Sequence, residues 1–226
     1  MCVIKKQILD IPASQIKDID SLFGQMAKIN MNEIPNNFKS ALNYTRELAY
    51  NSFKISCIIE SYGIDKMDDK NIILRNGKLL VSDILPEVFA HAFEIGFIVA
   101  TLQGYDEIDA IEDNMLNKLF LDNWGTAFIG RGNKWAMQFI AHKLEENELY
   151  ITHAFSPGQN KIPIEIQDVI FNTLNPSEIG VSLSDSFMMH PKKSVSGIFG
   201  IQTVDEDHVR PCDLCNRRDT CPTAFA

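Results

Sequence analysis

Three cysteines lie close together near the end of this 226-residue sequence, in the segment "DEDHVRPCDLCNRRDTCPTAFA". Cys212, Cys215 and Cys221 have the spacing Cys-x2-Cys-x5-Cys, and His208 lies four positions before the first of them. Two thiolates at the first spacing fit one metal ion, and a third nearby nearly completes a tetrahedral set of ligands. The fourth ligand could be His208, Cys57, Cys2 or none.

Three arginines surround these thiols, namely Arg210, Arg217 and Arg218. Their positive charge favours the thiolate form, which both metal binding and redox chemistry use. The tail is therefore a candidate site for zinc or for an iron–sulfur cluster. Redox-active thiols and inert free thiols stay open as alternatives.

The composition is that of an ordinary globular protein, with 45% hydrophobic and 23% charged residues. The net charge of -9 disfavours non-specific attraction to nucleic acid or anionic membranes. No basic-then-apolar leader opens the sequence, and no apolar run reaches the roughly 18 residues of a membrane span. We therefore expect a cytoplasmic protein, where a cysteine cluster is more often a metal or redox site than a structural disulfide. An odd count of five cysteines also weakens a disulfide framework.

Common catalytic motifs are missing from the sequence. It contains no phosphate loop, dinucleotide fingerprint, nucleophile elbow or zinc-protease helix. The five histidines are scattered, and none is paired locally with an acid at a catalytic spacing. A hydrolase is therefore disfavoured.

Two loops contain residues that could contact a ligand. "SPGQNKIP" (156–163) contains Gly158, which permits close approach of a ligand to the backbone, although a plain connecting loop has the same composition. "SFMMHPKKSVSG" (186–197) joins Met188 and Met189 to a histidine and two lysines. Exposed methionines form adaptable contact surfaces, and buried ones simply pack, so both interpretations of this loop stay open.

The first half of the sequence predicts strands and helices in turn. Residues 2–9 can form a strand, and apolar spacing indicates a helix over 33–53. Asn76-Gly77 between two apolar runs predicts a hairpin over 71–83. A buried strand is expected in the centre of 92–105, followed by a helix over 106–124 with Asp106 as its cap. That helix would bury one face, made of Ile108, Ile111, Met115 and Leu119.

The second half continues the irregular alternation. A helix is expected over 124–147, interrupted by Gly130 and Gly132, and another over 162–175, opened by Pro163. Strands are expected at 179–184 and 194–202. These elements predict an α+β (mixed α/β) fold.

The run "THAFSPGQNKIPIEIQDVIFNTLNPSEIGVSLSDSFMMHPKKSVSGIFGI" (152–201) resembles the activation domain of cobalamin-dependent methionine synthase. It is most similar to the stand-alone small proteins of that family from anaerobic bacteria, and the resemblance extends less specifically back to about residue 85. It implies a curved central sheet flanked by helices. The implied organisation is one domain over 1–205, with a more variable part at 1–60, and a cysteine-containing tail over 206–226.

The resemblance also implies a function. In the synthase this domain covers the cobalamin domain and binds S-adenosylmethionine, which remethylates the cofactor after a reducing electron rescues oxidised cobalt. By this likeness the chain is an accessory protein of corrinoid-dependent methyl transfer that docks on a corrinoid protein or methyltransferase. The corrinoid must arrive on that partner, because the sequence has no Asp-x-His-x-x-Gly loop for the lower cobalt ligand. A small-molecule or metal-binding module on the same scaffold is the alternative.

The sequence departs from the family where S-adenosylmethionine would bind. The family loop reads Arg-x-x-x-Gly-Tyr, and aligned on Gly158 its arginine and tyrosine positions hold Ala154 and Gln159. A glutamate expected in the preceding helix falls on or near Gly130. Binding of S-adenosylmethionine is therefore doubtful. The residues expected to face a ligand or the corrinoid are Ser156, Gly158, Gln159, Met188, Met189, His190, Ser194, Ser196 and Gly197.

Overall fold

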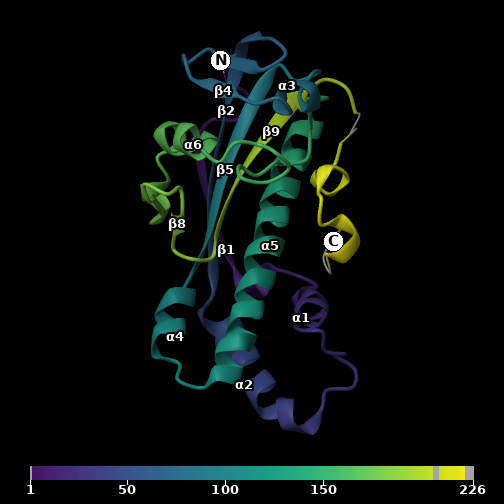
Figure 1. Ribbon diagram of the computed structural model, residues 1–226, viewed down its shortest axis with the longest axis vertical. Helices are drawn as coiled ribbons and strands as arrows, with labels where there is room; N and C mark the ends of the chain where they lie inside the picture. The colour runs from purple at the N-terminus through teal and green to yellow at the C-terminus, as the bar shows by residue number, and fades with distance from the viewer. Residues whose placement is uncertain (1, 206–208, 222–226) are drawn as a thin grey trace.

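The long strand β2 (Lys54–Met67) organises the sheet of this computed structural model, which describes residues 2–205 and 209–221 (Figure 1). On one edge β2 pairs along most of its length with β5 (Glu94–Gln103). On the other edge its first half pairs with β1 (Gln7–Pro12), and its last residues pair with β3 (Asn71–Leu74) after a bulge near Ile64. This change of partner along one strand goes with a sheet that is curved, as the family resemblance implied.

The remaining strands complete an antiparallel sheet in the order β4-β3-β2-β5-β9-β6, with β1 beside β2. A small two-stranded ribbon, β7 with β8, lies outside it. The bounds of these strands are Leu79–Val81 for β4, Tyr150–Ile151 for β6, Ser182–Leu183 for β7, Met189–His190 for β8 and Ser194–Gln202 for β9. The β3–β4 hairpin turns at Gly77, with φ of +81°, as its Asn-Gly signal predicted.

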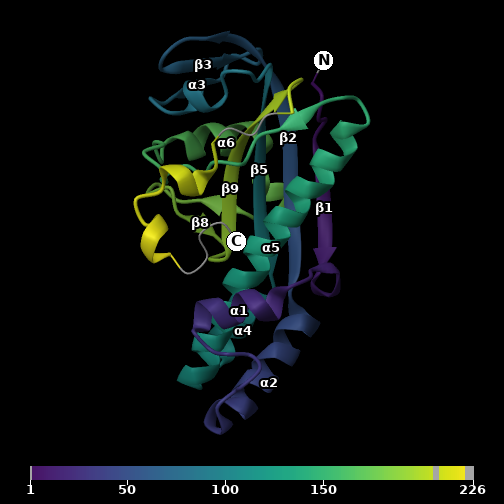
Figure 2. The same cartoon turned by 90° about the vertical axis from the view of Figure 1, so that its right-hand side faces the viewer.

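Helices cover both faces of the sheet (Figure 2). One face carries α5 (Met115–Glu145) together with α1 (Ile19–Ala27) and α2 (Asn36–Ser52). The other carries α6 (Ile166–Leu174) and the short α3 (Leu85–Val88). The helix α4 is Tyr105–Ile111, and the 3-10 helices are η1 (Ala13–Gln15), η2 (Pro176–Ile179), η3 (Pro211–Leu214) and η4 (Arg218–Thr220).

Strand β5 is buried on both faces because each face is covered by helix. Its residues alternate between the two hydrophobic clusters: Ile98 and Ala100 face the α5 side, and Phe97 and Val99 face the α6 side. This explains why the segment reads as an almost continuous apolar run, not as an alternating one.

The cluster on the α5 side is centred on Trp124, which is fully buried. Its ring stacks on Phe23 of α1, with 3.8 Å between ring centroids, and its Nε1 donates to Oγ1 of Thr45 on α2 at 3.2 Å. One side chain of α5 thus joins the three helices of this layer.

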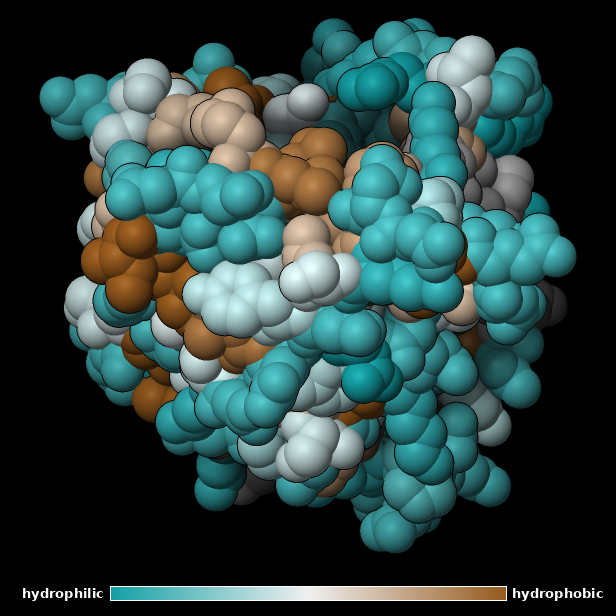
Figure 3. All heavy atoms as spheres, turned by 90° about the horizontal axis from the view of Figure 1, so that it is seen from below, coloured by the Kyte–Doolittle hydropathy of each residue, from teal (hydrophilic) through white to brown (hydrophobic). Residues whose placement is uncertain are grey.

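The prediction of one helix over 106–124 is wrong, because the helical conformation is interrupted between the end of α4 and the start of α5. Asn114 caps α5 there, its side chain accepting from the N–H groups of Leu116 (2.9 Å) and Asn117 (3.1 Å). The predicted apolar face is largely exposed, with Ile111 at 80% and Met115 at 79%. Figure 3, which views the molecule from below Figure 1, shows apolar groups among hydrophilic ones on that surface.

Other predicted bounds shift as well. The helix predicted from 124 is the later part of α5, and neither Gly130 nor Gly132 interrupts it. The first strand begins at Gln7, and α6 begins at Ile166. The strand predicted over 179–184 is reduced to two residues, because a 3-10 helix occupies 176–179. The predicted strand over 194–202 is confirmed as β9.

The cysteine tail lies outside these layers (Figure 1). Its described residues, 209–221, form the two short helices η3 and η4 and pair with no strand of the sheet. None of the helices in the described part of the chain is long and apolar enough to cross a membrane.

Candidate functional site

The loop after β6 is fixed to the last long strand of the sheet. Phe155 forms an antiparallel bridge with Ile198 of β9, in which each N–H donates to the other carbonyl at 2.8 Å. Phe155 is fully buried, whereas Ser156 just after it is half-buried, and Gly158 and Gln159 are exposed. The bridge therefore presents the predicted ligand-facing loop at the surface beside β9.

Gly158 is required where it stands. Its φ of +80° is in the left-handed region, and an added Cβ would lie 2.8 Å from Cδ1 of Ile164. Its N–H donates to the carbonyl of Ile162 at 2.9 Å, and the N–H of Ile162 donates to the carbonyl of Gln159 at 2.8 Å. These bonds make a tight, closed turn whose outer backbone is open to solvent.

The positions where the family would carry charged ligand groups hold small residues on the α5 side of the sheet. Ala154 packs in the α5-side cluster, and its Cβ lies 3.2 Å from where a Cβ on Gly197 would stand. Gly130 is exposed on α5, with no atom of its surroundings within 4 Å of an added Cβ. Neither position can form an ion pair with a ligand.

Two serines of β9, predicted to face a partner, are bonded within the protein. Oγ of Ser194 shares a hydrogen bond of 2.8 Å with Oγ1 of Thr101 and donates to the carbonyl of Pro191 at 2.7 Å. Ser196 is buried and donates to Oε1 of Gln167 at 3.3 Å. Nε2 of Gln167 donates in turn to the carbonyl of Phe187 at 3.2 Å. These bonds tie α6 and the methionine loop to β9.

The adjacent methionines have different environments. Met188 is 63% exposed, whereas Met189, in β8, is half-buried against the α6-side cluster. His190, next along β8, is exposed. Met188 is therefore available as a contact surface, whereas Met189 packs inside the protein.

The two lysines after this loop have acidic partners inside the chain. Nζ of Lys192 lies 2.7 Å from Asp109 of α4, and this contact raises the pKa of Lys192. Nζ of Lys193 lies 2.7 Å from Asp122 of α5 and 5.1 Å from the ring centre of Tyr105. The loop is thus joined to both helices by ion pairs.

The cysteines of the tail do not converge in the described residues. Cys212 and Cys215 are half-buried and Cys221 is exposed. Within 2–205 and 209–221, no three His, Cys, Asp or Glu side chains form a group that could hold a metal ion. His208 lies outside the described residues. The metal site therefore stays a prediction.

The other two cysteines differ in surroundings. Cys57 is fully buried in the α5-side core, and burial raises the pKa of its thiol to about 12. Such a thiol cannot reach the surface tail, so Cys57 is no candidate for the fourth ligand. Cys2 is half-buried near the start of the sequence.

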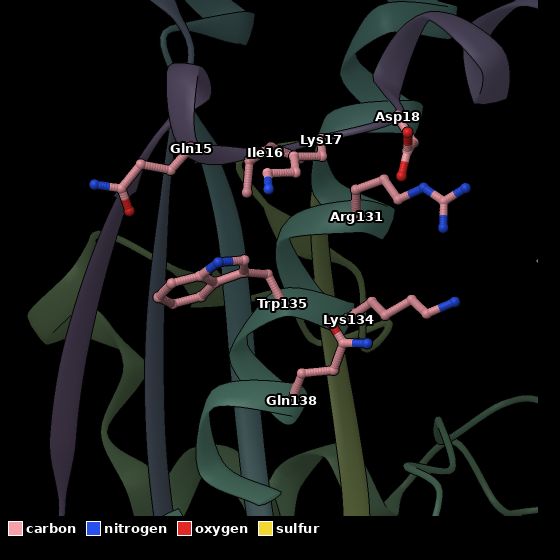
Figure 4. Close-up of a pocket in the computed structure, with 8 residues that line it drawn as sticks. All are labelled: Gln15, Ile16, Lys17, Asp18, Arg131, Lys134, Trp135 and Gln138. Carbon is pink, nitrogen blue, oxygen red and sulfur yellow. The ribbon is translucent and has the colours of Figure 1, made fainter. Parts of the chain in front are cut away.

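A pocket that the sequence did not predict lies between α5 and the segment linking η1 to α1 (Figure 4). Four of its lining residues, at positions 131, 134, 135 and 138, follow helical spacing along one side of α5. That spacing is visible in the sequence. Its partner segment, 15–18, is more than a hundred residues earlier, and only the fold brings the two together. The lining residues are Gln15, Ile16, Lys17, Asp18, Arg131, Lys134, Trp135 and Gln138.

The fold can be compared with known structures. The chain is similar to a solved structure described as the MetH reactivation domain bound to AdoHcy, with a TM-score of 0.63 and 14% sequence identity. The match covers 92% of this chain and 81% of that one. The chain has the reactivation-domain fold. No protein-family model and no curated protein matches the sequence. The predicted fold class is thus confirmed, while a likeness at this identity establishes the fold alone.

Proposed function

We propose that this chain is an accessory protein of corrinoid-dependent methyl transfer. It docks on a cobalamin-bearing methyltransferase or corrinoid protein and assists the reductive reactivation of that partner. The observation that carries the proposal is the reactivation-domain fold over 92% of the chain. The corrinoid belongs to the partner, because the sequence has no loop for the lower cobalt ligand.

The surface beside β9 supports this function because it keeps the backbone shape of a ligand loop. Gly158 holds an exposed turn that a side chain would strain, and Phe155 fixes that turn to β9. An exposed turn next to a strand can approach a flat partner surface closely, and glycine permits the closest approach.

In the proposed function this chain binds S-adenosylmethionine weakly or not at all. Ala154 and Gln159 stand where the family loop has arginine and tyrosine, and the glutamate expected in the preceding helix falls on or near Gly130. Charge-assisted hydrogen bonds contribute about 1.5–3 kcal/mol each, so the loss of two such groups removes most of the affinity for a charged ligand. The chain therefore acts on its partner through docking and not through bound S-adenosylmethionine.

Met188 is the apolar contact of the proposed docking surface, with the turn at Gly158 as the second element. The lysines beside it contribute indirectly, since Lys192 and Lys193 are paired with Asp109 and Asp122 and hold the loop in place. Burying a methionine side chain contributes about 1.5–3 kcal/mol, and Met188 has 63% of its surface available for this. Removing the contact should cost roughly 1–2 kcal/mol, which corresponds to about tenfold in affinity.

The second candidate function is a small-molecule or metal-binding module without methyl-transfer chemistry. The pocket at Arg131 favours it, because that pocket is large enough for a ligand and belongs to neither loop beside β9. The colour of protein purified without oxygen separates the two at the tail. A brown protein with iron favours electron transfer to the corrinoid, and a colourless one with zinc favours the structural module.

Binding to a cobalamin-loaded methyltransferase module tests the docking proposal. The chain should bind the loaded module, and Met188→Asp should weaken binding about tenfold. Met115→Asp is the matched control, since Met115 is 79% exposed at the first residue of α5, is not part of the proposed docking surface and should change nothing. No association with the module, or equal loss from both variants, would refute the proposed docking surface.

A further inference from the structure

The pocket between α5 and the η1–α1 segment has the size of a small-molecule site. Its volume is about 410 Å³, within the range of roughly 300–1,000 Å³ that is common for ligand pockets. Figure 4 shows its two walls: the helix α5 carries Arg131, Lys134, Trp135 and Gln138, and the connecting segment carries Gln15 to Asp18.

Positive charge gathers in this pocket although the chain as a whole is acidic. Lys17, Arg131 and Lys134 contribute three positive charges and Asp18 one negative charge, which leaves +2 against a net -9 for the chain. Charged walls of one sign focus the field in a cavity and raise the local concentration of ions of the opposite sign. The pocket therefore favours an anion.

Arg131 lacks an acceptor for one of its donors. Its Nε is buried and has no hydrogen-bond partner in the part of the chain that the structure describes. Among those same residues, no ion pair joins Arg131, Lys134 or Lys17 to a carboxylate. A buried charged donor without an acceptor is costly, and the planar guanidinium fits the two oxygens of a carboxylate or phosphate.

The other half of the pocket is apolar and aromatic. In Figure 4 the indole of Trp135 points away from the guanidinium of Arg131, and Ile16 lies above the indole. The Trp135 ring is held by Phe139, on which it stacks with 5.4 Å between centroids and 7° between planes. The indole thus lines one side of the pocket, and the guanidinium of Arg131 lies on the other.

We propose that this pocket binds a small anion. Arg131 and Lys134 hold its phosphate or carboxylate group. Asp18, whose carboxylate is turned to the same side as Arg131 (Figure 4), opposes the bound anion and limits its affinity. The inference is independent of the proposed docking function, because it rests on none of the residues of the surface beside β9.

Tryptophan fluorescence gives a direct assay, using phenyl phosphate, benzoate and uncharged phenol as probes. The chain has two tryptophans, and Trp124 is fully buried, so a change in emission on binding reports Trp135. Phenyl phosphate or benzoate should give a saturable change, and phenol should give none at the same concentrations. Calorimetry with Trp135→Phe checks that the signal comes from this indole.

Charge variants of the pocket decide whether its cations hold the anion. Arg131→Gln and Lys134→Gln should each weaken anion binding about tenfold, the loss of one charge-assisted bond. Lys134 is exposed, so its variant keeps the test valid if Arg131→Gln fails to fold. Asp18→Asn should strengthen binding, and asparagine tolerates the left-handed backbone there, with φ of 59°.

Lys118→Gln is the matched control, because it removes one positive charge from α5 outside the pocket. It should leave affinity unchanged. Equal loss from Lys118→Gln and Lys134→Gln, phenol binding as tightly as phenyl phosphate, or no saturable binding of either anion would overturn the proposal.

Discussion

Two glycines of α5, two residues apart, allow a test of how this helix packs on the sheet. An added Cβ at Gly130 meets nothing within 4 Å, whereas one at Gly132 would lie 2.7 Å from Cγ1 and 3.0 Å from Cγ2 of Ile55 in β2. Both stand in the interior of the same helix, so replacement by alanine brings the same gain in helix propensity, about 1 kcal/mol. Only their surroundings differ.

Gly130→Ala should therefore raise the free energy of unfolding by about 1 kcal/mol, which is roughly 2–4 °C in Tm for a chain of this size. At Gly132 the branched side chain of Ile55 cannot retreat from the buried core, and overpacking costs about 1–3 kcal/mol. Gly132→Ala should thus be less stable than Gly130→Ala by about 1–3 kcal/mol.

Urea unfolding of the two variants, followed by circular dichroism, measures this difference directly. Gly132→Ala unfolding at the same urea concentration as Gly130→Ala, or at a higher one, would show that α5 does not approach β2 as closely as described. A destabilised Gly130→Ala would instead mean that this exposed position makes a contact that the described residues do not include.

Three further outcomes are expected. Metal analysis of protein purified without oxygen or chelator should find zinc or iron bound to the cysteine tail, and less than about a tenth of an equivalent would contradict this, since thiolate sites bind tightly. Calorimetry should show weak or no binding of S-adenosylmethionine, and the double variant Ala154→Arg, Gln159→Tyr should strengthen it; a dissociation constant near 1 μM in the unaltered chain, about -8 kcal/mol, would mean that other residues hold the ligand. Cys57 should resist thiol reagents until the chain unfolds, because burial raises the pKa of its thiol from an ordinary 9.0 to about 12. Its contribution to the free energy of unfolding is full below pH 9 and is lost as the pH rises from 9 towards 12. Rapid labelling of a variant whose only cysteine is Cys57, in native buffer, would disprove its burial.

Local signals in the sequence were strong where one segment determines its own structure. The Asn76-Gly77 turn, the helix before Phe53 and the buried run of β5 all appear as predicted, because turn chemistry and burial pattern act within a few residues. The error at 106–124 had a local cause too. Asn114 caps α5 and so ends any helix that precedes it, whereas the apolar spacing that continues across it had predicted the buried face of a single helix.

Contacts between segments far apart in the sequence could not be predicted from the sequence. Which of Met188 and Met189 is exposed depends on which face of the β7–β8 ribbon meets α6, and the family resemblance did not specify that face. The pairing of Lys192 with Asp109 spans 83 residues, and the pocket at Arg131 joins two segments even further apart. Such contacts follow from the topology of the whole sheet and produce no periodic pattern in the sequence.

The pairing of charges separates the two surfaces proposed for this chain. The sequence has 30 acidic residues against 21 basic ones, so a basic residue without an acidic partner does not reflect a shortage of acids. Beside β9, the fold places Asp109 and Asp122 within 2.7 Å of the lysines, which leaves the exposed Met188 as the contact surface. In the pocket it leaves the buried Nε of Arg131 without a described acceptor. An anionic ligand can offset the charge of pocket cations that form no ion pair among the described residues, and this is why we assign a ligand to the pocket and a protein partner to the surface beside β9.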